Sequence, residues 1–68
     1  GKYDKAMKKF KKNLKNDPGD LQAVYGLATC LIAKGNYDEA RGFVARLDSE
    51  MPDNEDVNEL KQTLAKQV

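Results

Sequence analysis

The chain carries few of the side chains that enzymes use for chemistry. It contains no histidine, the residue that most often acts as a general base near neutral pH and as a metal ligand. Its one cysteine, Cys30, has no basic neighbour close enough in sequence to activate it, and we interpret it as a small buried apolar residue. We therefore expect no enzyme, no cofactor and no metal site.

An acidic run near the end of the chain, Asp53, Glu55, Asp56 and Glu59, could suggest a cation site. The run lacks the glycine and the alternating spacing of a calcium-binding loop. Helix capping and interaction with the N-terminal end of a helix dipole explain these acids better.

Lysines form the other conspicuous group. Residues 1–34 contain eight basic and three acidic side chains (+5) and residues 35–68 contain four and eight (−4), which sum to the net charge of +1. We interpret the lysines as a solvated outer face. Attraction to an acidic protein, RNA or an anionic membrane surface remains an alternative. Seven of these eight basic side chains lie within residues 2–15, and they are Lys2, Lys5, Lys8, Lys9, Lys11, Lys12 and Lys15.

The length allows one small domain, since 68 residues with 40% apolar side chains hold the material for a single core. No apolar run approaches the roughly 18 residues that span a bilayer, and a lone cysteine forms no internal disulfide. We expect a soluble domain and favour the cytoplasm. Because the chain begins with Gly1 rather than methionine, we expect a piece of a longer protein, and its N-terminus does not reveal its location.

A period of 34 residues runs through the chain. The segment 1–6, GKYDKA, returns as GNYDEA at 35–40, and Pro18 returns as Pro52. Of the pairs compared at this spacing, only Leu14 and Asp48 differ in type. A fixed period of this length indicates a repeat architecture.

Apolar residues at helical spacing predict four helices, over about 3–16, from 21, over 37–50 and from about 55. Asp20 is expected to cap the second helix, and Asp53 or Asn54 the fourth. Pro18 and Pro52 break helices, and Gly35 suits a left-handed helix end. The expected apolar faces are Tyr3, Ala6, Met7, Phe10 and Leu14 in the first helix; Leu21, Val24, Leu27, Ala28, Leu31 and Ile32 in the second; Ala40, Phe43, Val44 and Leu47 in the third; and Val57, Leu60, Leu64 and Val68 in the fourth.

The spacing of these residues resembles the tetratricopeptide repeat family, whose unit is an antiparallel helix pair of about 34 residues. The resemblance implies an all-α, right-handed superhelix of helix pairs. Residues 21–54 would form one complete repeat, residues 1–18 the second helix of a preceding repeat, and residues 55–68 a C-terminal capping helix. The packing positions that carry the resemblance are Ala6, Phe10, Leu27, Ala28, Leu31, Tyr37, Ala40, Val44, Leu47 and Pro52.

The resemblance also implies a function. Members of the family bind peptides or partner helices in the concave groove lined by the first helix of each repeat. The matching positions here are Gln22, Tyr25, Thr29 and Ala33, and Gly26 is expected to leave room for a close approach. The cationic and asparagine side chains with which some members clamp a terminal carboxylate are absent from these positions.

We therefore expect a non-catalytic module that binds a protein or peptide through its concave face. Two alternatives stay open: a structural spacer or self-assembly segment, and an RNA or lipid binder that uses the lysine-rich first helix. The edge around Ala6, Met7 and Phe10 is expected to be partly exposed, which would favour self-association through open ends of the solenoid.

Overall fold

Residues 1–67 are described by a computed structural model and contain four helices and no strand. This confirms the all-helical prediction. Val68, which the sequence placed in the last apolar face, lies outside the described residues. The helices are α1 (Lys2–Asn16), α2 (Leu21–Ala33), α3 (Tyr37–Glu50) and α4 (Glu55–Ala65).

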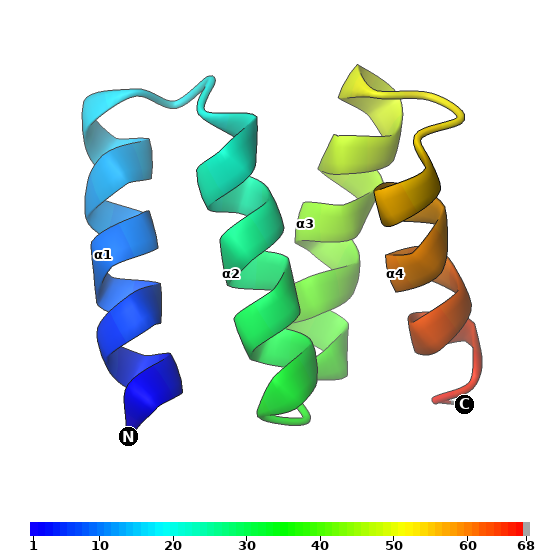
Figure 1. The fold of residues 1–68 in the computed structure, drawn as a ribbon, viewed down its shortest axis with the longest axis horizontal. Coiled ribbons are helices and arrows are strands. Elements are labelled where there is room, and N and C mark those ends of the chain that lie inside the picture. Colours follow the sequence, from blue (N-terminus) through cyan, green and yellow to red (C-terminus); the bar gives the residue numbers. More distant parts are fainter. Residues whose placement is uncertain (68) are drawn as a thin grey trace.

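Consecutive helices run antiparallel and lie side by side in chain order (Figure 1). The connections at 17–20 and 51–54 lie at one end of the bundle, and the turn at 34–36 lies at the other. Helix α2 packs against α1, α3 and α4, whereas α1 and α4 lie at opposite ends of the array. The molecule is a slab of 29 × 26 × 16 Å.

Side-chain caps start the second and fourth helices. The carboxylate of Asp20 accepts a hydrogen bond from the backbone N–H of Ala23 at 3.2 Å, which confirms the predicted cap. The side chain of Asn54, 34 residues later, accepts from the N–H groups of Asp56 and Val57 at 2.9 and 3.1 Å. Of the two predicted caps for α4, Asn54 is therefore the one used.

The turn between α2 and α3 depends on Gly35, whose φ of +81° confirms the predicted left-handed conformation. The N–H of Gly35 donates to the carbonyl of Ile32, and the N–H of Asn36 donates to that of Leu31. These two bonds satisfy carbonyls that the end of α2 would otherwise leave free.

The core lies between the helices and draws mainly on α2, α3 and α4. The fully buried large side chains are Val24, Leu27, Leu31, Leu47 and Val57. Small residues, among them Ala28 and Ala40, are also fully buried and let the helix backbones approach closely. Phe43 and Tyr37 are half-buried against this core, whereas Pro52 is exposed and acts on the backbone rather than by packing.

Helix α1 differs from the sequence expectation at Tyr3, the first residue of its apolar face. Tyr3 was expected in the core but is 52% exposed; it lies in the first turn of α1 and is not among the side chains packed against the core. The edge expected to be partly exposed is covered in part: Met7 is buried, whereas Ala6 and Phe10 are half-buried. Helix α2 supplies that cover, since α1 packs on no other helix.

The seam between α1 and α2 is closed by an aromatic ring placed over a glycine. A Cβ atom built on Gly26 would lie 2.5 to 2.8 Å from the ring atoms of Phe10, a distance that real Cβ atoms do not show. The space beside Gly26 therefore holds Phe10, and the expectation that it leaves room for a partner was wrong.

Candidate functional site

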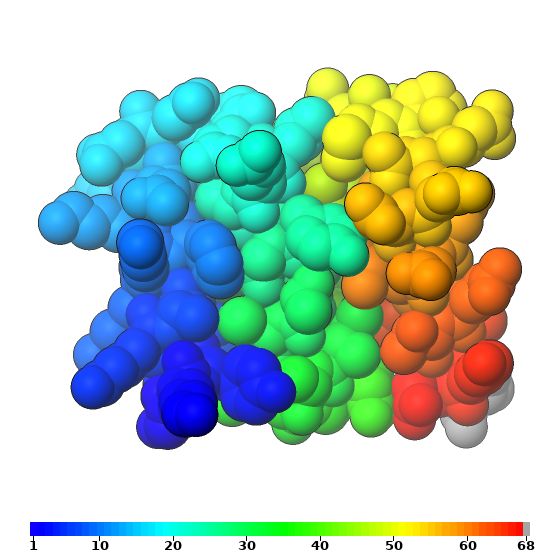
Figure 2. All heavy atoms as spheres, in the orientation of Figure 1, coloured from blue at the N-terminus to red at the C-terminus, as the bar shows by residue number. Residues whose placement is uncertain are grey.

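One face of the molecule is formed by α2 and α4 lying next to each other (Figure 2). The 34-residue period relates their outward positions, so that Gln22 and Tyr25 of α2 correspond to Asp56 and Glu59 of α4. Thr29 likewise corresponds to Thr63, and each hydroxyl donates to the carbonyl four residues earlier, at 2.9 and 3.0 Å. At this pair of threonines the repeat is preserved in hydrogen bonding as well as in residue type.

A depression of about 260 Å³ lies between the first turns of these two helices. Its apolar lining comes from Tyr25 and Met51, both half-buried, together with Leu21. Polar groups stand among them, as is usual in binding depressions. The complete lining is Leu21, Gln22, Tyr25, Met51, Asn54 and Asp56.

The sequence-derived site is divided by the structure. Gln22 and Tyr25 line the depression together. Thr29 and Ala33 are exposed on the same helix but lie outside it. Met51, Asn54 and Asp56 were not predicted to belong to this site, although the position 34 residues after Gln22 is Asp56.

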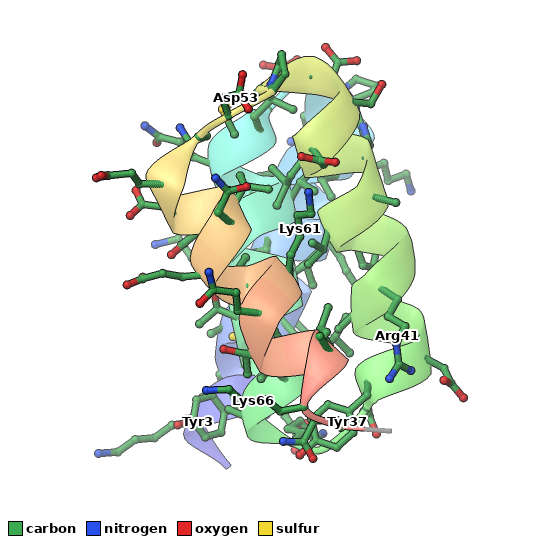
Figure 3. The ribbon with its side chains drawn as sticks, turned by 90° about the vertical axis from the view of Figure 1, so that its right-hand side faces the viewer. Tyr3, Tyr37, Arg41, Asp53, Lys61 and Lys66 are labelled. Atoms are coloured by element: carbon green, nitrogen blue, oxygen red, sulfur yellow. The ribbon has the colours of Figure 1, made fainter. Side chains whose placement is uncertain are left out.

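A second groove, of about 410 Å³, lies between α3 and α4. Val44 and Leu64 form its buried floor, and charged side chains stand over it. The ammonium group of Lys61 lies 3.2 Å from the carboxylate of Asp48, while Arg41 pairs with Asp38 at 2.7 Å. Figure 3 shows Arg41 on α3 and Lys61 on α4 along this groove.

The lysine-rich face covers the outside of α1, where all seven lysines are exposed. Within residues 1–67, none of the seven forms an ion pair. The acid of this helix, Asp4, pairs instead with Lys34 at the end of α2. The hydrogen bond and charge of Lys34, aided by the terminal amine, hold the pKa of the Asp4 carboxyl below its ordinary value.

The side chains that could bind a metal ion or react as a thiol are few in the described part of the chain. No cluster of cysteine and carboxylate side chains in residues 1–67 could hold a metal ion. Cys30 is 7% exposed and belongs to the core, as expected of a small apolar residue. None of the four helices has the length and apolar character needed to cross a membrane.

The family model for the tetratricopeptide repeat matches residues 1–64. The chain belongs to the tetratricopeptide repeat family. The match confirms the predicted resemblance and the helical solenoid. No curated protein and no solved structure matched the chain. Tetratricopeptide repeats are generally non-enzymatic scaffolds for protein–protein interaction.

Proposed function

We propose that this tetratricopeptide repeat chain is a non-catalytic module that holds a peptide or partner surface on the face formed by α2 and α4. The observation that carries the proposal is the depression between these helices, in which the half-buried ring of Tyr25 lies beside Met51 and the polar side chain of Gln22. Partly exposed aromatic side chains beside polar groups are frequent energetic centres of protein interfaces.

The expected domain organisation is consistent with this function. If residues 21–54 form the complete repeat and residues 55–68 a capping helix, the depression lies at the junction between them. The first turns of α2 and α4 then line it, and both turns are held by the caps at Asp20 and Asn54. A rigid depression loses little conformational entropy when a partner binds.

The test is capture of partners from native lysate with the chain as bait. A Gln22→Ala/Tyr25→Ala variant removes the side chains of the depression, and a Glu39→Ala/Ser49→Ala variant alters exposed positions of α3 as a matched control. Partners should be lost with the first variant and kept with the second. Equal folding of both is checked by thermal unfolding.

The rival functions predict different results. A structural spacer would keep the same partners with both variants, which would contradict the proposal. A binder that uses the exposed lysines of α1 would lose its partner in a Lys8→Gln/Lys12→Gln variant and when salt is raised, because contacts with phosphates are strongly salt-dependent.

A further inference from the structure

The face formed by α2 and α4 is electrostatically one-sided. Helix α2 has no charged residue from Leu21 to Ala33. The outward side of α4, by contrast, begins with the exposed carboxylates of Glu55, Asp56 and Glu59. Negative charge therefore borders one side of the depression, and an uncharged wall borders the other.

These three carboxylates are not neutralised within the described residues. The ion pairs of residues 1–67 use Asp4, Asp38 and Asp48, and none reaches Glu55, Asp56 or Glu59. The nearest basic residue in sequence, Lys61, is paired with Asp48 across the other groove. The lysines of α1 lie at the far end of the slab.

Stabilisation of α4 accounts for only part of this charge. The side chain of Asn54 already accepts hydrogen bonds from the first N–H groups of α4, so the acids are not needed as caps. Glu55 and Asp56 lie in the first turn, where the helix dipole favours anions. Glu59 lies in the second turn, where that effect has largely faded.

The depression itself fits an apolar group. Its volume of about 260 Å³ suits one apolar side chain, which would contact Leu21, Tyr25 and Met51. Asp56 lines this depression and also the acidic surface formed with Glu59, so an apolar side chain seated here would bring its sequence neighbours next to the carboxylates.

We infer that this face selects a polypeptide segment in which an apolar side chain is flanked by lysine or arginine. The inference rests on the proposed function and adds the chemistry of the partner. The apolar side chain fills the depression between α2 and α4, and the flanking cations pair with Asp56 and Glu59. Exposed pairs of this kind contribute selectivity and faster association more than affinity.

The experiment is an NMR titration of the ¹⁵N-labelled chain with three short Gly/Ser peptides. Each peptide carries one phenylalanine, flanked by lysine, by glutamate or by glutamine. We expect the lysine peptide to shift the amide resonances of Gln22, Tyr25, Met51, Asp56 and Glu59, and to bind at least threefold more tightly than the glutamine peptide. The glutamate peptide should bind most weakly.

Matched variants locate the effect. Asp56→Asn/Glu59→Gln should weaken binding of the lysine peptide about three- to tenfold, as expected for two exposed ion pairs. Glu39→Gln/Glu50→Gln removes the same charge from exposed positions of α3 and should leave the affinity unchanged.

Each other outcome contradicts a distinct claim. If all three peptides bind the depression equally well, the inference fails while the proposed function stands. If no peptide shifts resonances of this face, or the shifts lie elsewhere, both fail. If the chain alone shows concentration-dependent shifts of α1 and α4 together, the occupant is the lysine-rich helix of a second copy, and the inferred separate partner is wrong.

Discussion

At the scale of single residues, two backbone positions of the turns are left-handed, and they carry different amino acids. Gly35 has φ of +81° and Asp53 has φ of +63°. Glycine adopts this conformation without strain. For residues with a Cβ atom the conformation costs roughly 1–2 kcal/mol of conformational energy, and for aspartate somewhat less. The turn before α4 is therefore less well suited to its residue than the turn after α2.

Substitutions at Gly35 and Asp53 should shift the free energy of unfolding in opposite directions. Gly35→Ala is expected to lower the free energy of unfolding by about 1–2 kcal/mol, because alanine is strained at positive φ. Asp53→Gly is expected to raise it by a few tenths of a kcal/mol, up to about 0.5. Urea unfolding followed by circular dichroism measures both, and a stabilising Gly35→Ala would show that the turn differs from the one described.

A second residue-scale prediction concerns pH. Because Lys34 lowers the pKa of Asp4 in the folded chain, this pair stabilises the fold above the unfolded pKa of about 3.9, and the contribution is lost as pH falls through the folded pKa. A ¹³C carboxyl titration should place the midpoint of Asp4 below that value. Lys34→Gln should raise the midpoint, whereas Lys8→Gln, which alters an unpaired lysine of α1, should not.

At the scale of elements, equivalent packing positions in the two halves of the repeat are filled by side chains of different size. Phe10 and Gly26 close the seam of α1 and α2, and the positions 34 residues later hold Val44 and Leu60, both in the core. In the α1–α2 seam the large ring of Phe10 lies against Gly26. The equivalent residues of α3 and α4, Val44 and Leu60, are closer to each other in size. The repeat keeps these positions in the packed interior, whereas the sizes of the side chains that fill them differ.

The different surroundings of two helical glycines predict opposite effects of the same mutation. Gly26→Ala should lower the free energy of unfolding by about 1–2 kcal/mol, since overpacking against Phe10 outweighs the gain in helix propensity. Gly42→Ala on α3 meets no atom within 4 Å and should raise it by about 0.5–1 kcal/mol.

A second substitution separates overpacking from other causes. Phe10→Val should recover most of the loss in the Gly26→Ala background, although it destabilises the parent chain. Additive effects in this double-mutant cycle would contradict direct contact between the two positions.

At the scale of the whole molecule, charged residues in the α3–α4 pair replace apolar residues of the α1–α2 pair. The apolar residues Met7, Leu14 and Leu27 of the α1–α2 pair correspond to Arg41, Asp48 and Lys61 of the α3–α4 pair. The α3–α4 groove therefore has an apolar floor under charged side chains, with Lys61 and Asp48 48% and 39% exposed. Charges over an apolar groove disfavour the addition of another helix, because adding one would desolvate them.

Removing these charges should make the molecule self-associate. An Arg41→Met/Asp48→Leu/Lys61→Leu variant restores the side chains of the first pair and exposes a continuous apolar surface. Sedimentation velocity should detect association at lower protein concentration than for the parent chain. Identical sedimentation would show that the charges do not protect this end.

Much of the fold follows from local information. The caps at Asp20 and Asn54, the turn at Gly35 and the limits of α3 depend on neighbours within a few residues, and each was predictable. Tyr3 was misjudged because helical periodicity gives the direction of a side chain and not which side chains of another helix lie opposite it. Gly26 was misjudged because its neighbour, Phe10, is distant in sequence.

The sequence by itself determined that helices recur every 34 residues, where they begin and end, and which of their faces are apolar, since these properties arise from backbone hydrogen bonding and side-chain spacing within each segment. Only the tertiary structure decided that Gln22 and Tyr25 share a depression with Met51 and Asp56 while Thr29 and Ala33 do not. The depth of a depression between two helices depends on how closely they pack, and this distance is set by side chains from both helices.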